Sequence, residues 1–204
     1  DTFKDDLYGQ FDMLKEKTRL KVLNYFQSTL PDYIKKMPTY DIVLVERTNE
    51  EQYYRAIEEK KMDQLSGAML RSVENHGDLV QAMRNEFVTK FDNLVLERAS
   101  IYYQYHIFNN AKIIIAQHGA ALSNMFFMKP TNENNSCTVI EISPPSPNVL
   151  PQFREGAKSH FKNLAKHLKI KHIILEQSGI HSAVPAQQLV DVTKNAMNEI
   201  DGSI

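Results

Sequence analysis

Short runs of aliphatic and β-branched residues recur along this chain and alternate with segments of helical periodicity. The most strand-like run lies at residues 112–116, and the run at residues 41–46, rich in β-branched residues, predicts a strand covered on both faces. Because parallel strands need long crossover connections, usually helical, the pattern predicts an α/β domain with a parallel sheet between helices. The predicted strands cover residues 41–46, 93–97, 112–116, 138–142 and 172–176.

Apolar residues at helical spacing occupy most of the chain between these runs. They predict helices at residues 2–28, 78–87, 101–110, 153–168 and 186–200. Ser100 is a suitable N-cap for the third of these helices. The chain therefore divides into an N-terminal helix and connector, residues 1–38, and a sheet-bearing part, residues 39–204. The charged segment 49–62 predicts a solvated excursion, and the four prolines of 143–151 predict a rigid loop.

The charge balance excludes some partners. The 204 residues include 24 Lys and Arg against 25 Asp and Glu, so no basic field is available for nucleic acid or an anionic lipid surface. With 42% hydrophobic and 24% charged residues, the composition is that of a globular protein of one domain, or of half of a two-domain enzyme. An anionic ligand would have to be bound locally.

The single cysteine and the N-terminus indicate in which cellular compartment the protein is expected. Cys137 has no second cysteine with which to form an internal disulfide, so a reducing compartment is the simplest inference. No run reaches the ~18–20 apolar residues of a membrane helix, and the N-terminus lacks a signal peptide's features. We expect a cytoplasmic protein. The start at Asp1 leaves the alternative of an excised fragment that had a targeting segment for the lumen of the secretory pathway, where the sequon Asn134-Asn135-Ser136 would matter.

Several familiar catalytic motifs are missing from the sequence. It contains no G-x-G-x-x-G, no P-loop, no G-x-S-x-G and no D-x-D, which excludes the usual dinucleotide and nucleotide fingerprints, the esterase elbow and an obvious carboxylate pair for a divalent metal. Three histidines, His160, His167 and His172, lie close together in the sequence. Neutral surface histidines explain their spacing at least as well as a metal site, so we expect no metal there.

The remaining candidate is the strand, turn and helix at residues 112–126. Gly119 allows close approach of a ligand to the backbone, and the N–H groups at the start of the next helix favour an anion such as phosphate. The alternative is that Gly119 and the alanines after it only allow close packing of helix on sheet. His118 ends the strand, where side chains enter the ligand crevice of a parallel sheet, or it hydrogen-bonds a neighbouring loop. Asn124, one turn later, faces the same crevice or caps local backbone.

Arginines provide the third part of the candidate site. Arg47 directly follows the strand at 41–46, so its guanidinium is expected at the same sheet edge as Gly119. The planar fork of an arginine suits a diphosphate. Arg71 is a second candidate. The alternative for both is a solvated or carboxylate-paired side chain.

The residues around Gly119 carry a resemblance to a known family. Residues 111–128, followed by Val139-Ile140-Glu141-Ile142, resemble glycosyltransferase family 61, in which a strand leads into H-G-A-G-L-T-N, a large apolar segment and V-V-E-I. The specific part is the block His118-Gly119-Ala120-Ala121-Leu122-Ser123-Asn124. Upstream, Val45-Glu46-Arg47 is similar to the family's strand ending in Arg, Arg71-Ser72-Val73-Glu74-Asn75 to its R-x-[IV]-x-N box, and Gln104 to its Gln before the strand.

This resemblance, which spans roughly residues 41–145, implies a fold and an activity. The fold would be the Rossmann-like, doubly wound nucleotide-sugar-binding domain of a B-type glycosyltransferase. The activity would be inverting transfer, without a required metal or other cofactor, from a donor such as a UDP-sugar to a glycan or protein hydroxyl. Such enzymes pair two facing domains, and the chain has strands for one. We therefore expect the acceptor-binding domain to be missing, or reduced to the N-terminal helix.

The resemblance also implies a donor site. With no D-x-D to hold a cation, amide groups and arginines would stabilise the leaving diphosphate. Glu141 would bind ribose hydroxyls or support a loop, and no general base is assigned. The expected donor-binding residues are Arg47, Arg71, Asn75, His118, Gly119, Ala120, Ala121, Ser123, Asn124 and Glu141.

Two departures from the family pattern concern this site. Ala121 replaces the second glycine, and the excursion at 48–70 separates Arg47 from Arg71 further than usual. Two other classes of protein therefore stay open as alternatives. One is a non-catalytic nucleotide- or sugar-binding module derived from such a domain, and the other is a structural α/β domain of a larger assembly.

Overall fold

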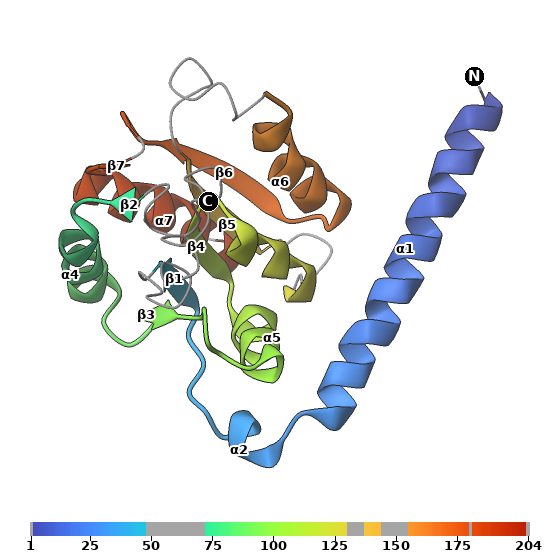
Figure 1. Cartoon of the computed structure of the whole chain (residues 1–204), viewed down its shortest axis with the longest axis horizontal. Coiled ribbons are helices and arrows are strands. Elements are labelled where there is room, and N and C mark those ends of the chain that lie inside the picture. The colour runs from blue at the N-terminus through green and yellow to red at the C-terminus, as the bar shows by residue number, and fades with distance from the viewer. Residues whose placement is uncertain (1, 48–71, 130–136, 144–154, 180, 203–204) are drawn as a thin grey trace, which may run out of the picture.

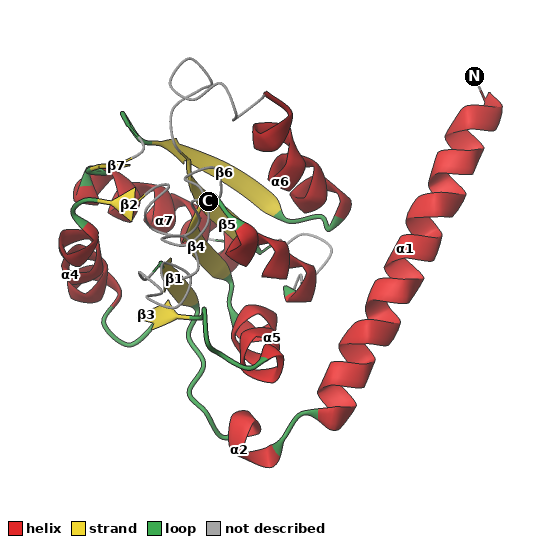
Figure 2. Cartoon of the chain, in the orientation of Figure 1, coloured by secondary structure: helices red, strands yellow, loops and turns green. Residues whose placement is uncertain are grey.

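Five parallel strands form the central sheet of the computed structural model, with the order β3-β1-β4-β5-β6 (Figures 1 and 2). The strands are β1 (Ile42–Glu46), β3 (Phe91–Val95), β4 (Ile113–Gln117), β5 (Thr138–Ser143) and β6 (Lys171–Glu176). Every residue of β4 and β5 is buried, as the continuous apolar runs predict. The structure describes residues 2–47, 72–129, 137–143, 155–179 and 181–202.

Two helices cover one face of the sheet. They are α4 (His76–Phe87) and α7 (Ala186–Asp201), which pack against each other as well as against the strands. Leu79 and Met83 of α4 and Leu189 of α7 are buried there against Ile115 and Ile140. The alternate residues of each strand face the opposite layer, so both faces have a hydrophobic core.

The other face is covered by α5 (Ile101–Asn110), the 3₁₀ helix η3 (Ala120–Phe127) and α6 (Glu155–His167). Ser100 caps α5 as predicted, because its Oγ accepts a hydrogen bond from the Tyr103 N–H at 3.2 Å. The core of this layer includes Phe108, Leu122, Met125 and Phe161.

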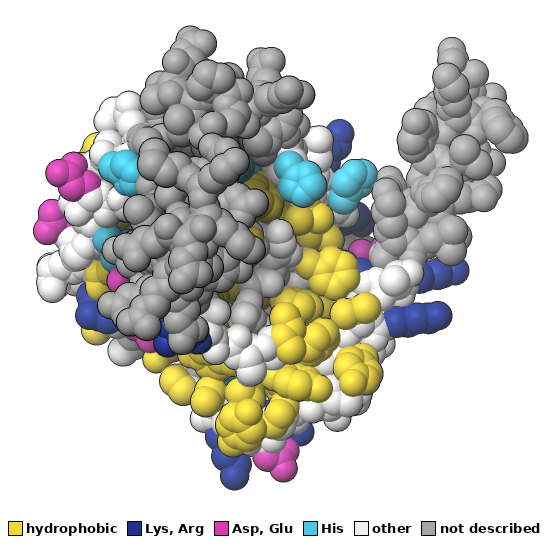
Figure 3. Space-filling model, viewed as in Figure 1, with side chains coloured by type: hydrophobic (Ala, Val, Ile, Leu, Met, Phe, Trp, Pro, Cys, Tyr) yellow, Lys and Arg dark blue, Asp and Glu magenta, His cyan; other side chains and the backbone are white. Residues whose placement is uncertain are grey.

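The long N-terminal helix α1 (Thr2–Thr29) packs against this second layer through its last turns. Leu23 is buried, and Phe26 stacks on Tyr105 of α5 with ring centroids 5.1 Å apart. Hydrophobic side chains also gather on the surface over α5 and the end of α1 (Figure 3), where Tyr25 and Ile101 are exposed. The start of α1 extends beyond the sheet-bearing domain (Figure 1).

Three short elements were not expected from the sequence. They are α2 (Asp32–Lys35), β2 (Ser72–Val73) and β7 (His181–Ser182), and the two strands form a separate parallel pair. The Gln177 amide, just beyond β6, donates to the carbonyls of Ser72 and Ser182 at 3.0 and 2.8 Å and so fixes this pair near the carboxyl end of β6. Two-residue strands have no periodicity, so sequence patterns could not predict them.

The predicted architecture is confirmed: the chain is an α/β protein with a Rossmann-like parallel sheet between helices, preceded by a long helix. The bounds of one strand were predicted two residues too far along the chain. Strand β3 covers residues 91–95 instead of 93–97, because buried Phe91 begins it and Val95 already lies exposed at its end. Within the described residues, no helix is both long enough and apolar enough to span a membrane.

Candidate donor-binding site

The order of the strands defines where a ligand crevice forms. The chain leaves β1 for β3 on one side and then crosses back to β4 on the other side of β1. Helix α4 follows β1 on one face of the sheet, whereas η3 follows β4 on the opposite face. The first helices described after β1 and β4 therefore cover opposite faces of the sheet. Ligands of doubly wound folds bind at such a switch point, beyond the carboxyl ends of the strands.

A cavity of about 280 Å³ occupies this position. Arg47, Gly119 and the start of η3 contribute to its wall, so the structure brings together the residues that the sequence placed at one sheet edge. The lining residues are Val45, Arg47, Leu96, Glu97, Gln104, Ala116, Gln117, Gly119, Ala120, Ala121 and Asn124. A smaller cavity of about 70 Å³, bounded by Ser72, Val73 and His76, lies on the other side of Arg47.

Arg47 lies against the backbone that links β4 to η3. Its Nη1 donates a hydrogen bond to the His118 carbonyl oxygen at 3.2 Å. The guanidinium also lies directly over Gly119, where an added Cβ would be 3.0 Å from Nη1 and 3.4 Å from Cζ. The missing side chain of Gly119 thus provides the space that Arg47 occupies. A planar cation is fixed in this way at the entrance to η3.

The backbone at Gly119 is not strained. Its φ of 161° and ψ of −174° are extended values that any residue can adopt. The turn that the sequence predicts here therefore does not need glycine for its backbone conformation. Glycine is required here because the Arg47 side chain approaches so closely.

The helix that the sequence predicts after Gly119 is present, and it is a 3₁₀ helix. Residues three apart eclipse in this geometry, and the burial of η3 follows that period. Leu122, Met125 and Met128 form the fully buried row, whereas Ala120 and Ser123 are exposed. The composition of small and large apolar residues gave no sign of the tighter winding.

Two amide groups at the start of η3 are left without a partner inside the helix. The first internal bond runs from the Leu122 N–H to the Gly119 carbonyl at 3.0 Å, so the N–H groups of Ala120 and Ala121 precede the ladder. Both residues line the cavity. Together with the Arg47 guanidinium they form a set of donors suited to an anion.

Asn124 connects η3 to α5. Its Nδ2 donates to Gln104 Oε1 at 2.6 Å, and the Gln104 amide donates in turn to the Ala99 carbonyl at 2.9 Å. Both side chains line the cavity. Ser123, in contrast, points to the exposed side of η3 and is not among the lining residues. The sequence therefore placed Asn124 at the cavity correctly, whereas the structure does not bring the Ser123 side chain there.

His118 and Glu141 lie on the other side of β4, where they form a buried cluster with His172. His118 Nδ1 hydrogen-bonds one Glu141 carboxylate oxygen, and His172 Nε2 hydrogen-bonds the other at 2.7 Å. The Glu141 side chain is only 1% exposed. The ring of His118 also packs edge-on against Phe161 of α6, with centroids 5.2 Å apart. Of His118, the carbonyl reaches Arg47, whereas the imidazole faces Glu141.

The cluster keeps the Glu141 carboxylate ionised. Burial by itself raises the pKa of this carboxyl, but the hydrogen bonds and charges of His118 and His172 outweigh burial and lower the pKa from 4.5 to about 2. His172 was expected at the surface, and that expectation was wrong because its side chain is only 4% exposed. With both oxygens of Glu141 engaged, the arrangement favours a supporting role for this residue over contact with a ribose.

The two remaining predicted residues lie elsewhere. The Asn75 amide donates to the Val184 carbonyl and accepts from the Val184 N–H, both at 2.9 Å, so it joins the start of α4 to the segment before α7. Asn75 does not line the larger cavity. Arg71 lies outside the described residues, as do the excursion at 48–70, the sequon at 134–136 and the proline-rich loop from residue 144 to 151.

Sequence reasoning missed two polar residues of the cavity wall, Glu97 and Gln117. Glu97 was missed because the bounds of β3 were predicted wrongly: Glu97 was assigned to the strand, which in fact ends at Val95. A strand end after Val95 would have identified Glu97 as a crevice residue. Gln117, the last residue of β4, is buried and contacts Gln177 at 3.5 Å, and its position at a strand end was the available sign. Among the described residues, no group of three or more His, Cys, Asp or Glu side chains is arranged so that it could hold a metal ion.

Fold and cavity together define a class of protein: a Rossmann-like domain with an arginine-lined crevice at its switch point. Residues 47–134 match the family model of Glycosyltransferase 61. The match begins at Arg47 and extends beyond the end of η3, so it contains most of the cavity wall. The resemblance to this family that the sequence shows is confirmed over this segment, which makes up less than half of the chain. No curated protein matches the chain.

Proposed function

We propose that this protein transfers a sugar from a nucleotide-sugar donor and that the donor's diphosphate binds in the cavity between β1 and β4. The observation that carries the proposal is the position of Arg47, whose guanidinium lies over Gly119 at the start of η3. The family match supports a glycosyltransferase in general, and the cation with its neighbouring amides adds a place for the leaving group.

The proposed reaction is an inverting displacement at the anomeric carbon. The acceptor oxygen forms a bond to this carbon from the face opposite the diphosphate, and the bond between the carbon and the diphosphate oxygen breaks. The electron pair of the broken bond stays on the leaving diphosphate, which gains negative charge. The N–H groups of Ala120 and Ala121 and the Arg47 guanidinium are placed to stabilise that charge. The acceptor proton passes to a base that the described residues do not identify.

We propose that no divalent metal takes part. The sequence has no D-x-D, and the cavity wall itself provides a fixed cation and amide donors for the diphosphate. Asn124 is a positioning residue in this scheme, and so is His118 through its carbonyl. Arg71 is proposed as a second cation from outside the described residues. A UDP-sugar donor and a glycan or protein hydroxyl as acceptor are the choices that the family resemblance implies.

Calorimetric titration with UDP, GDP, CDP and dTDP tests donor binding. We expect one of the four, UDP on the present proposal, to bind with the same affinity in the presence of EDTA or Mg²⁺. Loss of affinity with EDTA would contradict the metal-free scheme. Failure of all four to bind would contradict the proposed function.

Incubation with UDP-sugars then tests for turnover. Release of UDP, by hydrolysis or transfer, is the result expected of an enzyme. Tight UDP binding without release in the presence of candidate acceptors would instead identify a non-catalytic binding module.

A further inference from the structure

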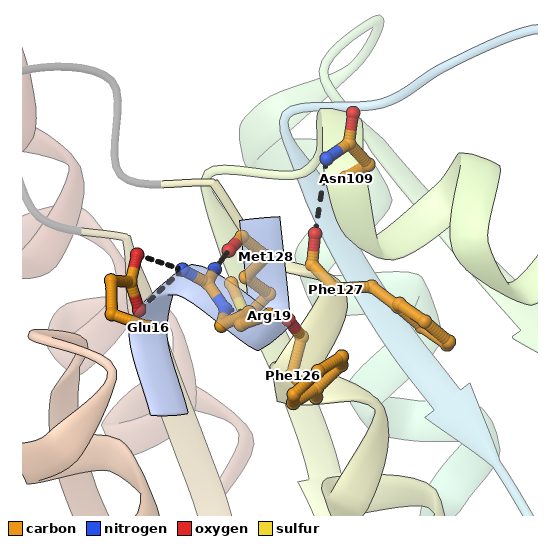
Figure 4. Close-up of polar contacts among 6 residues, drawn as sticks. All are labelled: Glu16, Arg19, Asn109, Phe126, Phe127 and Met128. Atoms are coloured by element: carbon orange, nitrogen blue, oxygen red, sulfur yellow. Dashed lines mark hydrogen bonds and ion pairs between the residues drawn. The ribbon is translucent and has the colours of Figure 1, made fainter. Parts of the chain in front are cut away.

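The last turn of η3 is held by side chains from two other helices (Figure 4). Arg19 of α1 donates from Nε to the Phe126 carbonyl at 2.9 Å and from Nη2 to the Met128 carbonyl. Asn109 of α5 donates from Nδ2 to the Phe127 carbonyl at 3.1 Å. These three consecutive carbonyls have no acceptor role inside η3, since its ladder ends with the bond from the Met128 N–H to Met125.

Arg19 is an unusual residue to find in this position. Its side chain is only 6% exposed, and burying a guanidinium costs free energy unless its donors are satisfied. Each edge of the group has a partner, because Nη1 donates to the Glu16 carboxylate at 3.1 Å while the other two nitrogens reach η3. A positive charge at the carboxyl end of a helix also complements its dipole. The contact is thus specific, unlike the apolar packing of Leu23 and Phe26 farther along α1.

The opposite end of η3 forms part of the cavity wall. Residues 122–125 lie between the Ala121 amide and the Phe126 carbonyl that Arg19 binds, and two of them, Leu122 and Met125, are fully buried. A 3₁₀ helix has weaker internal hydrogen bonds than an α-helix, so contacts at its ends contribute more to fixing its position. Displacement of a binding group by about 1 Å can cost a hundredfold in function.

We propose that Arg19 is a positioning residue of the donor site: by binding the carboxyl end of η3, it fixes the amides of Ala120 and Ala121 that receive the diphosphate. This inference rests on the proposed function, because it assigns the N-terminal helix a part in the same site. Helix α1 lies outside the segment that matches the family model, so the match does not imply this role.

The test compares Arg19→Met with wild type by calorimetry, with inorganic pyrophosphate and UDP as probes. Methionine keeps the apolar stem but removes all donors. We expect affinity for both anions to fall roughly tenfold, since several charge-assisted bonds that fix the site are lost. Uridine, which lacks phosphates, should bind as before. Arg19→Lys, which keeps the charge without the planar fork, should recover part of the affinity.

Arg84→Met is the matched control. Arg84 lies on α4, is 55% exposed and is 3.6 Å from Asp92, so the same substitution there removes an arginine away from the cavity. This variant should bind both anions like wild type. If Arg19→Met fails to fold, Asn109→Ala is used instead, since it removes only the bond to Phe127. Its affinity for both anions should fall about threefold, the effect of one neutral hydrogen bond.

Amide hydrogen exchange over η3 gives a second readout that needs no ligand. We expect exchange at residues 122–127 to rise roughly tenfold in Arg19→Met, because the helix opens more readily without its terminal contacts. Unchanged exchange, or unchanged pyrophosphate affinity beside a wild type that binds, would overturn the inference while leaving the proposed function intact. A wild type that binds neither pyrophosphate nor any nucleoside diphosphate would overturn both.

Discussion

The two sides of strand β4 use polar residues in opposite ways. Toward β1, where α4 and η3 lie on opposite faces of the sheet, there is a cavity lined by Arg47 and the first residues of η3. Toward β5 and β6, His118 after β4 meets Glu141 within β5 and His172 near the start of β6, and these side chains fill the space next to Phe161 of α6. A change in the direction of the crossovers opens the first side, whereas sequential strands close the second.

Because of this difference, the side of β4 with the cavity (the open side) is suited to ligand binding, whereas the filled side (the closed side) is suited to stabilising the fold. On the open side, the cavity is lined by the first residues of η3 and by Arg47, whose guanidinium donates to the His118 carbonyl. On the closed side, a carboxylate with a pKa of about 2 has both oxygens engaged by histidines. The open side therefore suits an anionic ligand, and the closed side suits a fixed internal network.

Gly119→Val is expected to cause the largest loss of ligand affinity on the open side. The new Cβ would lie 3.0 Å from Arg47 Nη1, and the branched side chain would displace the guanidinium from the start of η3. Because the extended backbone accepts valine, we expect a folded protein whose UDP affinity falls by roughly a hundredfold or more, the loss of about 3 kcal/mol.

Gly77→Val is the matched control, since no heavy atom lies within 4 Å of an added Cβ at that position on α4. Calorimetry on both variants and circular dichroism to check folding make the comparison. Unchanged UDP affinity in Gly119→Val would mean that this glycine serves packing alone.

Glu141→Gln disrupts the cluster with His118 and His172 on the closed side, and it should lower the free energy of unfolding instead of the ligand affinity. The folded-state pKa is lowered from 4.5 to about 2, so the carboxylate's contribution is fully present above pH ~4.5 and is lost as the pH falls toward 2. A shift of this size corresponds to on the order of 3 kcal/mol in the free energy of unfolding.

Urea unfolding of wild type and Glu141→Gln at pH 5 and pH 2.5 measures this contribution. The stability difference should shrink at the lower pH, while UDP affinity at pH 7 stays within about threefold of wild type because Glu141 does not line the cavity. A large loss of UDP affinity in a stably folded variant would show that the closed side contributes to binding after all.

Arg47→Ala tests how much the charge of Arg47 contributes to ligand affinity on the open side. A charged hydrogen bond to phosphate is worth about 1.5–3 kcal/mol, so UDP and pyrophosphate should each bind roughly tenfold more weakly or worse. Uridine should be unaffected, and Arg84→Ala should match wild type. Equal losses for uridine and UDP would indicate damage to the fold. Arg71→Ala should behave like Arg47→Ala if that residue reaches the same anion, and should have no effect if it does not.

Asn124→Ala should give the smallest effect. It removes the 2.6 Å bond to Gln104 and loosens η3 relative to α5, which predicts a loss of about threefold in UDP affinity. Asn85→Ala, which removes an exposed amide contact with Gln81 on α4, is the control for loss of an amide hydrogen bond. Calorimetry that shows no difference between the two variants would exclude Asn124 from positioning the site.

The sequence predicted the features that depend on local periodicity. Five apolar runs gave five parallel strands, and the end of β1 placed Arg47 at the edge where β4 delivers Gly119. These predictions succeed because strands buried on both faces need continuous apolar residues, and because parallel strands present their carboxyl ends together. The same logic failed by two residues at β3, an edge strand with a weaker pattern, and so concealed Glu97.

Contacts between distant segments were decided only by the tertiary structure. Glu141 meets both His118 and His172 because β5 lies between β4 and β6, an adjacency that no local pattern encodes. Arg19 reaches carbonyls more than a hundred residues away, and Asn75 bonds Val184 across a similar separation. Local sequence fixes which residues can be buried or can end a strand. The partners that satisfy a buried polar group depend on packing of the whole chain, since burial makes an unpaired group too costly to leave.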